Sequence, residues 1–144
     1  MRFVIETNDE DGFVDLSLEL QHISNYIQLN QLRFNNNLQI DFEYVGITEH
    51  KKIIPFLLIT LVENAFKYGD LSDSCHPLKI RIDISSTGIR FEIFNKINTL
   101  NLYEKHGIGM ENLKKRLIHF YKTNFKLDIK NDGHFYNCVL QIEY

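Results

Sequence analysis

The chain has 144 residues, of which 44% are hydrophobic and 24% charged, and its formal net charge is -3 at pH 7. These values are typical of one soluble globular domain, and no excess of positive charge attracts nucleic acid or anionic lipid. The longest uncharged apolar run, residues 53–62, is far shorter than the roughly 20 residues that a membrane-spanning helix needs. Cys75 and Cys138 lie far apart without metal-binding spacing, which favours free thiols in a reducing compartment.

The first predicted elements are a helix and a strand. Asp15 or Ser17 can cap the helix, and its apolar positions recur at helical spacing: Leu16, Leu20, Ile23, Ile27 and Phe34. Three asparagines, residues 35–37, end it. Apolar and polar residues then alternate over residues 38–44, which predicts a half-buried strand.

A second helix and a hairpin follow. Pro55 suits the first turn of a helix and Gly69 suits its end, so we expect the helix between them. Residues 70–77 form a polar loop. Residues 78–84 and 89–93 alternate on either side of a turn at 85–88, which predicts a β-hairpin.

The last third of the chain contains a loop over residues 98–106, a helix from Gly109 or Met110, and a second hairpin with its turn at residues 131–133. Together these elements predict an α+β two-layer sandwich, with about three helices on one face of a mixed, mostly antiparallel sheet of about five strands. We expect one domain over residues 15–144, preceded by a linker over residues 1–14.

The second predicted helix carries a narrow polar stripe on an otherwise apolar surface. Its members are three or four residues apart and therefore share one face: Thr60, Glu63, Asn64 and Lys67. A carboxylate can act as a base, an amide oxygen can bind a hard cation, and an ammonium can bind phosphate. The stripe therefore suggests a polyanion held with a metal. The alternative is an ordinary solvent-facing stripe on an amphipathic helix.

Two further features are candidates for the same site. Gly107 and Gly109 precede or open the third helix, where free backbone N–H groups can bind an anion; the alternative is a flexible loop. Asn95 falls in register with the inward-facing residues of its strand. It can therefore bind the edge of a base, or it can be a turn residue.

Three segments in order resemble a known family. They are LSLELQHISNYIQLNQLRF at residues 16–34, ENAFKYG at 63–69 and GIGMENLKKRL at 107–117. Together they resemble the ATP-binding catalytic domain of sensor histidine kinases. That domain has the Bergerat-type fold of the GHKL superfamily, which type II topoisomerases, Hsp90 and MutL share. The first segment is similar to the LytS type of histidine kinase.

The resemblance implies a role for each matching residue. Glu63 would be the general base or polarising carboxylate, Asn64 the Mg²⁺ ligand, and Lys67 a phosphate contact. Asn95 takes the place of the aspartate that binds the adenine amino group. Because a neutral acceptor forms a weaker hydrogen bond than a charged one, we expect roughly tenfold weaker adenine binding.

The glycine-containing segment would form the phosphate end of the site. Gly107 and Gly109 would be the hinge of a lid over the phosphates, with Asn112 near them and Arg116 as a further phosphate contact. The stretch Phe94-Asn95-Lys96-Ile97-Asn98 lacks the glycine that normally follows the aspartate.

The resemblance also implies a function, namely transfer of the γ-phosphoryl group of Mg-ATP to a histidine. That histidine would lie on an upstream dimerisation hairpin absent from this chain, and a response regulator would then receive the phosphoryl group. The domain would be cytoplasmic, and its parent protein would be anchored in the inner membrane. His22 lacks the phosphoacceptor pattern and is interpreted as an ordinary boundary histidine. The alternatives are a non-kinase GHKL ATPase module and a degenerate nucleotide-binding or interaction module.

Overall fold

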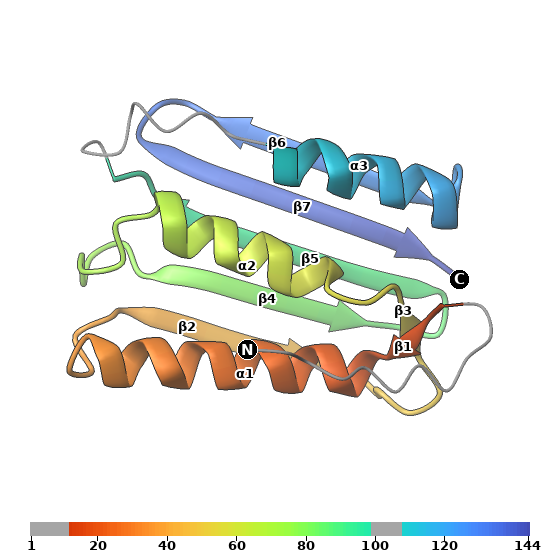
Figure 1. Cartoon of the computed structure of the whole chain (residues 1–144), viewed down its shortest axis with the longest axis horizontal. Helices are drawn as coiled ribbons and strands as arrows, with labels where there is room; N and C mark the ends of the chain where they lie inside the picture. The colour runs from red at the N-terminus through yellow and green to blue at the C-terminus, as the bar shows by residue number, and fades with distance from the viewer. Residues whose placement is uncertain (1–11, 99–107) are drawn as a thin grey trace.

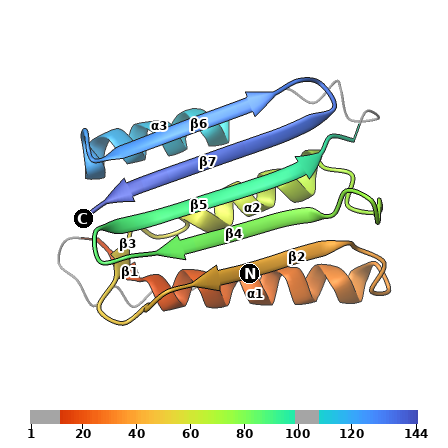
Figure 2. The same cartoon turned by 180° about the vertical axis from the view of Figure 1, so that it is seen from behind.

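A computed structural model of the chain describes residues 12–98 and 108–144. Within these ranges the helices are α1 (Leu16–Arg33), α2 (Leu57–Tyr68) and α3 (Ile108–Tyr121). They lie on one face of a sheet whose opposite face carries no helix in the described residues (Figures 1 and 2). The predicted two-layer α+β sandwich is confirmed.

The main sheet has the strand order β2-β4-β5-β7-β6. Its strands are β2 (Ile40–Val45), β4 (Leu78–Ile84), β5 (Gly88–Lys96), β6 (Phe125–Asn131) and β7 (Phe135–Glu143). β2 pairs parallel to β4, and the other neighbours pair antiparallel. Both predicted hairpins, β4–β5 and β6–β7, are therefore present, and the sheet is mixed as expected.

Two short strands lie outside the main sheet and were not predicted. β1 (Val14–Asp15) pairs antiparallel with β3 (Lys52–Ile53), with Asp15 opposite Lys52. The Asp15 carboxylate binds the Lys52 ammonium at 2.8 Å. Asp15 occupies the N-cap position of α1 as expected, but its side chain makes no capping hydrogen bond because it is directed to this ion pair.

The core lies between the helices and the inward face of the sheet. The alternation predicted for β4 and β5 is observed, since Ile80, Ile82, Phe91 and Ile93 are buried while their neighbours are not. Each buried aliphatic side chain contributes about 1.5–3 kcal/mol relative to its exposed state. The helices supply the other layer through Leu16, Leu20, Ile23, Leu58, Leu61, Val62, Leu113 and Leu117. Phe34 is an exception to the predicted apolar face: it is the C-cap of α1 and 46% exposed.

The start of α2 is held by residues from both other helices. Glu19 of α1 is 1% exposed and accepts hydrogen bonds from the backbone N–H groups of Phe56 (3.1 Å) and Leu58 (3.2 Å). Arg116 of α3 donates to the carbonyl oxygen of Pro55. Helix N-termini leave backbone N–H groups unpaired, so a buried carboxylate from a neighbouring helix can cap them. These contacts fix α2 between α1 and α3.

Candidate functional site

The polar stripe of α2 lies on the part of the helix that faces away from the core. Glu63 and Lys67 are exposed and Asn64 is half-buried, while the remaining faces are buried through Leu58, Leu61, Val62 and Ala65. Thr60 differs from the other three, because its hydroxyl donates to the Phe56 carbonyl oxygen at 2.5 Å. Thr60 is therefore engaged within the helix, and Glu63, Asn64 and Lys67 supply a carboxylate, an amide and an ammonium on this face.

Glu63 lies next to a tyrosine of α1. Partial burial raises the pKa of the Glu63 carboxyl above its ordinary value. Burial and then the negative charge of Glu63 raise the pKa of the Tyr26 hydroxyl. Tyr26 in turn packs edge-on against the ring of Phe66, with centroids 4.9 Å apart. A carboxylate with a raised pKa holds a proton more firmly, which suits a general base.

Lys67 lies near the last turn of α2. Its ammonium is 5.2 Å from the centroid of the Tyr68 ring, which is within range of a cation–π contact. A positive charge at this position is also favourable because the C-terminus of a helix carries a partial negative charge. The contact holds the flexible lysine side chain at the end of the helix where the stripe terminates.

Asn95 lies at the inward face of β5 and is 2% exposed. Its Nδ2 donates to the carbonyl oxygen of Lys96 at 3.1 Å. Its Oδ1 is buried and has no hydrogen-bond partner in the described part of the chain. An unpaired buried oxygen costs about 1–3 kcal/mol, so a ligand that donates a hydrogen bond here would relieve that cost. The exocyclic amino group of adenine is such a donor.

Gly69 ends α2 directly beside Asn95. A Cβ atom built at Gly69 would lie 2.4 Å from the Ala65 carbonyl oxygen and 3.0 Å from the Asn95 Nδ2. The backbone at Gly69 is extended, with φ of -85°, so the glycine is needed for close approach and not for a left-handed conformation. The helix end was predicted correctly, and a side chain at this position would collide with the last turn of α2 itself and crowd Asn95 of β5.

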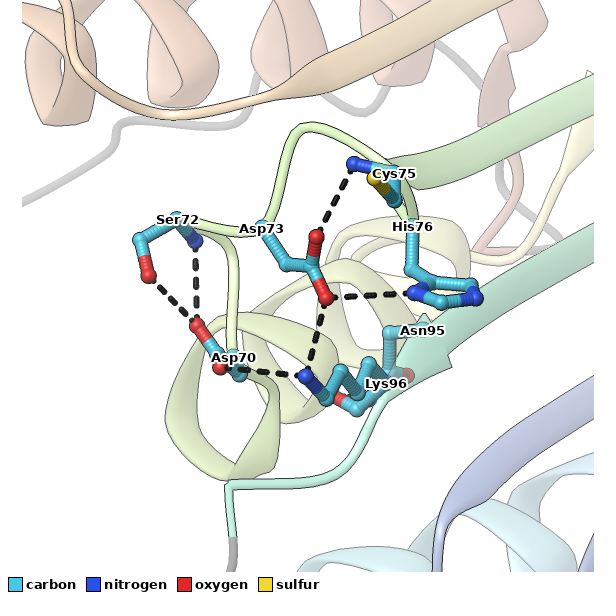
Figure 3. A network of polar contacts seen from close by, with 7 residues as sticks. All are labelled: Asp70, Ser72, Asp73, Cys75, His76, Asn95 and Lys96. Atoms are coloured by element: carbon cyan, nitrogen blue, oxygen red, sulfur yellow. Dashed lines mark hydrogen bonds and ion pairs between the residues drawn. The ribbon is translucent and has the colours of Figure 1, made fainter.

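A polar network surrounds the end of β5 on the loop that follows α2 (Figure 3). The Lys96 ammonium is 2.8 Å from the Asp73 carboxylate and 3.9 Å from that of Asp70. Asp73 also accepts from the Cys75 backbone N–H at 2.9 Å and lies 3.1 Å from His76 Nδ1. We call these side chains, together with Ser72, which donates to Asp70, the loop network.

The predicted phosphate end of the site is described in part. Gly107 lies outside the described residues. Gly109 is exposed in the first turn of α3, and no described atom lies within 4 Å of a Cβ atom built there. Packing in the described residues therefore does not explain this glycine, and the open space suits a ligand that approaches the backbone.

Two residues further along α3 have different surroundings. Asn112 is exposed, and Arg116 is half-buried with its guanidinium on the Pro55 carbonyl oxygen. Arg116 therefore helps to join α3 to the start of α2, the end opposite Lys67. A phosphate contact from Arg116 stays a prediction.

The elements that carry the candidate residues meet at one end of the sheet. α2 and β5 both end there, and the chain after β5 pairs with the chain after α2: Asp70 N–H donates to the Lys96 carbonyl oxygen and Asn98 N–H to that of Tyr68, each at 2.8 Å. The N-terminal end of α3 points toward the same end (Figure 1). The structure thus groups Asn95 and Gly69 beside the last turn of α2.

Sequence reasoning missed Tyr136. It pairs with Asn95 across β5 and β7, so the two side chains share the inward face of the sheet. Burial is the main cause of the raised pKa of its hydroxyl. A half-buried aromatic residue beside Asn95 can contact the face or edge of a base. The alternation in β7 indicated its face, but only the strand register identifies its partner.

The helix-free face carries a depression of about 810 Å³, lined partly by Glu43, Arg81, Glu92 and Asn137. Arg81 is already paired there, with Glu43 at 2.6 Å and Asp83 at 3.1 Å. Glu92 is paired with Arg90 at 3.4 Å. The lining also carries the acidic side chains of Asp41, Glu43 and Glu92, which repel a polyanion, so we place the candidate site on the helical side.

Solved structures with a similar fold are histidine kinases or their catalytic domains. One is the catalytic domain of the histidine kinase ThkA, with a TM-score of 0.67, 15% identity, and coverage of 91% of this chain and 95% of that one. Another is the histidine kinase AdeS of Acinetobacter baumannii, with a TM-score of 0.62, 15% identity, and coverage of 91% and 66%. A ThkA structure in complex with the response regulator TrrA also matches, with a TM-score of 0.58, 16% identity, and coverage of 91% and 41%. The fold is therefore that of a histidine kinase catalytic domain.

Relatives in sequence are sensor histidine kinases. The sensor protein LytS of Staphylococcus saprophyticus is 26% identical over 83% of this chain, and the sensor protein kinase HptS of Staphylococcus aureus is 25% identical over 100% of it. An uncharacterised sensor-like histidine kinase of Staphylococcus epidermidis is 31% identical over 74%. No protein-family model matches the chain. The comparisons confirm the resemblance to sensor histidine kinases.

The chain spans only part of these relatives. It covers 22% of LytS, 20% of the Staphylococcus epidermidis kinase and 26% of HptS. No helix in the described ranges combines the length and the apolar character that crossing a membrane requires.

Proposed function

We propose that this chain is the ATP-binding catalytic domain of a two-component sensor histidine kinase. The observation that carries the proposal is the buried, unpaired Oδ1 of Asn95 beside the last turn of α2, where Asn64 and Lys67 supply an amide and an ammonium. A nucleotide with a hydrogen-bond donor on its base and a triphosphate fits this combination. The fold and the sequence relatives, all histidine kinases or their catalytic domains, support the same function.

Each residue has a proposed role. The Oδ1 of Asn95 accepts from the adenine amino group, the amide oxygen of Asn64 binds Mg²⁺, and Lys67 contacts phosphate. Mg²⁺ prefers oxygen ligands and keeps several waters, so one amide oxygen together with phosphate oxygens is a sufficient set. When bound, Mg²⁺ neutralises charge on the phosphates. Glu63 orients or deprotonates the attacking histidine, and its raised pKa suits that role.

The phosphate end of the site includes α3. Gly109 allows close approach of the backbone, and Asn112 lies one turn further on. Gly107, Asn112 and Arg116 remain proposed contacts on the basis of the family resemblance.

The partners follow from the same proposal. The acceptor histidine lies on an upstream dimerisation domain of the same protein, and a response regulator receives the phosphoryl group. The ThkA complex with TrrA supports a response regulator as a partner. Because ATP and response regulators are cytoplasmic, we place this domain in the cytoplasm, within a membrane-anchored parent.

A reconstitution with three outcomes tests the proposal. The domain is mixed with Mg-ATP and with a fragment carrying the upstream helices, and bound nucleotide, phosphohistidine and free phosphate are measured. Binding together with phosphohistidine supports the kinase. Binding with steady phosphate release and no phosphohistidine would indicate a non-kinase ATPase, and no Mg-dependent binding would indicate an interaction module.

A matched pair of variants localises the binding. Asn64→Ala removes the proposed magnesium ligand and should weaken Mg-ATP binding by about tenfold or more. Asn25→Ala removes an exposed asparagine of α1 whose Oδ1 accepts from Gln21 at 3.0 Å, and should leave binding unchanged. Equal effects of the two substitutions on Mg-ATP binding would show that Asn64 does not bind the magnesium ion.

A further inference from the structure

The residue after Asn95 is a lysine whose ammonium and backbone carbonyl oxygen both contact the loop that follows α2. Asn95 faces the helices, while Lys96, one residue further, faces the other side. We propose that Lys96 is a positioning residue for Asn95, and that its ion pair with Asp73 sets the preference of the site for a 6-aminopurine over a 6-oxopurine nucleotide. This inference rests on the proposed nucleotide-binding function.

The first step concerns the side chain of Lys96. Its ammonium binds the Asp73 carboxylate at 2.8 Å, and the carboxylate of Asp70 is 3.9 Å away (Figure 3). The hydrogen bond from Lys96 lowers the pKa of Asp73 well below its ordinary range, so this carboxylate is charged at neutral pH. The Asp73 side chain is itself fixed, because it also accepts from the Cys75 backbone N–H at 2.9 Å. The ion pair therefore joins the end of β5 to the loop network.

The second step concerns the backbone carbonyl of Lys96. Its oxygen accepts from the Asp70 backbone N–H at 2.8 Å and from the Nδ2 of Asn95 at 3.1 Å. A carbonyl oxygen can accept two hydrogen bonds, so the Asn95 amide is oriented by the same atom that joins β5 to the loop. Turning this amide over would place two oxygens against each other and lose the bond. Lys96 thus holds the Asn95 amide with its nitrogen turned toward the backbone.

The third step is the consequence for the base. With its nitrogen occupied, Asn95 presents only its Oδ1, which is buried and unpaired. An oxygen accepts from the 6-amino group of adenine and repels the 6-oxo group of guanine. An unconstrained asparagine can turn over and donate to that oxo group instead, so an asparagine at this position selects adenine only if its amide is held. The absence of a glycine in residues 95–98 is consistent with a segment that keeps one conformation.

The test measures base preference with three substitutions. Dissociation constants for Mg-ATP and Mg-GTP are determined by calorimetry for the wild type, Lys96→Met, Lys96→Arg and a control. Lys96→Met should weaken ATP binding by about three- to tenfold while GTP binding is unchanged or tighter, so that the ATP-to-GTP preference falls. Lys96→Arg keeps the charge and donors and should retain most of the preference. The control is Lys126→Met, which removes another lysine paired with an aspartate, Asp128 at 3.8 Å, on the distant strand β6.

The outcomes separate this inference from the proposed function. If the wild type binds neither nucleotide, the proposed function fails. If the wild type binds ATP and Lys96→Met weakens ATP and GTP equally, Lys96 acts only through general attraction of phosphate, and the positioning role is wrong. An unchanged preference would overturn it as well. If Lys96→Met fails to fold, Asp73→Asn breaks the same ion pair from the loop side, keeps an acceptor for the Cys75 N–H, and must lower the preference in the same way.

Discussion

Gly69 is the residue at which packing and the candidate site are most closely linked. A Cβ atom there would lie 2.4 Å from the backbone oxygen of Ala65 and 2.9 Å from the Leu71 side chain. Because the backbone cannot move away cheaply, Gly69→Ala should lower the free energy of unfolding by about 1–3 kcal/mol. Urea denaturation measures the change.

Gly109 supplies the control for this substitution. No described atom lies within 4 Å of a Cβ atom built there, and the residue is in the first turn of a helix. Gly109→Ala should therefore leave the free energy of unfolding unchanged or slightly raised, because alanine favours the helix. If both substitutions cost the same, close approach is not the reason for Gly69.

The Glu63 carboxyl provides a prediction for the reaction itself. Partial burial raises its pKa above the ordinary value of a glutamate. If the deprotonated carboxylate is the base, the rate of phosphotransfer should fall as the pH decreases through this raised pKa. Glu63→Gln should lower the rate by about 10²–10⁴-fold with ATP binding retained, and that acidic limb should disappear. Single-turnover phosphohistidine formation across pH measures both effects.

Glu143→Gln is the matched control, since this exposed glutamate is at the end of β7 away from α2. It should leave both the rate and its pH dependence unchanged. A Glu63→Gln variant that transfers phosphoryl groups at the wild-type rate would leave Glu63 with a structural role only.

At the scale of elements, Glu19 links α1 to the N-terminus of α2. Burial raises its pKa, and the backbone hydrogen bonds from Phe56 and Leu58, followed by the nearby charge of Arg116, act in the opposite direction. Glu19→Ala removes the acceptor of the Phe56 and Leu58 backbone N–H groups and should cost about 1.5–3 kcal/mol of unfolding free energy. Glu19→Gln keeps one acceptor oxygen and should cost less.

The raised pKa of Glu19 also predicts that the stability of the protein depends on pH. Because the folded-state pKa of Glu19 lies above its unfolded value, the unfolded chain loses this proton first as pH rises. The stability of the wild type relative to Glu19→Gln should therefore be greatest below about pH 4.5 and decrease as pH rises through the folded pKa. Urea midpoints measured from pH 4 to 8 test this, and a difference that does not vary with pH would contradict it.

The elements differ in how far the sequence predicts them. The alternation over β4 and β5 and the turn at residues 85–88 specify the β4–β5 hairpin. One face of each strand is buried, and a shift of the strand register by one residue would expose its apolar side chains. β1 and β3 have two residues each, which is too short for any period to appear. Glu19 caps α2 by accepting hydrogen bonds from Phe56 and Leu58, which lie 37 and 39 positions further along the chain. Local sequence patterns contain no information about such a contact.

The candidate site was predictable to a similar extent. Asn95 is visible because a polar residue at a buried position departs from the periodicity of its strand, and the stripe of α2 is visible because its polar residues recur at helical spacing. The Lys96–Asp73 ion pair depends on the conformation of an eight-residue loop, 70–77. The position of Tyr136 beside Asn95 depends on the register of β5 and β7. Neither is determined by residue type and spacing alone.

At the scale of the whole molecule, nucleotide binding should stabilise the fold. A ligand present at a hundredfold excess over its dissociation constant adds about 2.7 kcal/mol to the free energy of unfolding. Mg-ATP should therefore raise the melting temperature of the wild type in thermal denaturation, and ATP with a chelator should raise it less. A melting temperature that is indifferent to Mg-ATP at every concentration would contradict nucleotide binding by the folded domain.

The most direct measurement places the metal. Mn²⁺ replaces Mg²⁺ in the ATP complex, and its paramagnetic broadening of the protein's NMR signals is mapped along the chain. We predict the strongest ATP-dependent broadening at Asn64 and Lys67 on α2, with Asn137 on the helix-free face remaining sharp. Broadening centred on Glu92 and Asn137 in the depression of that face, or none that depends on ATP, would contradict the account.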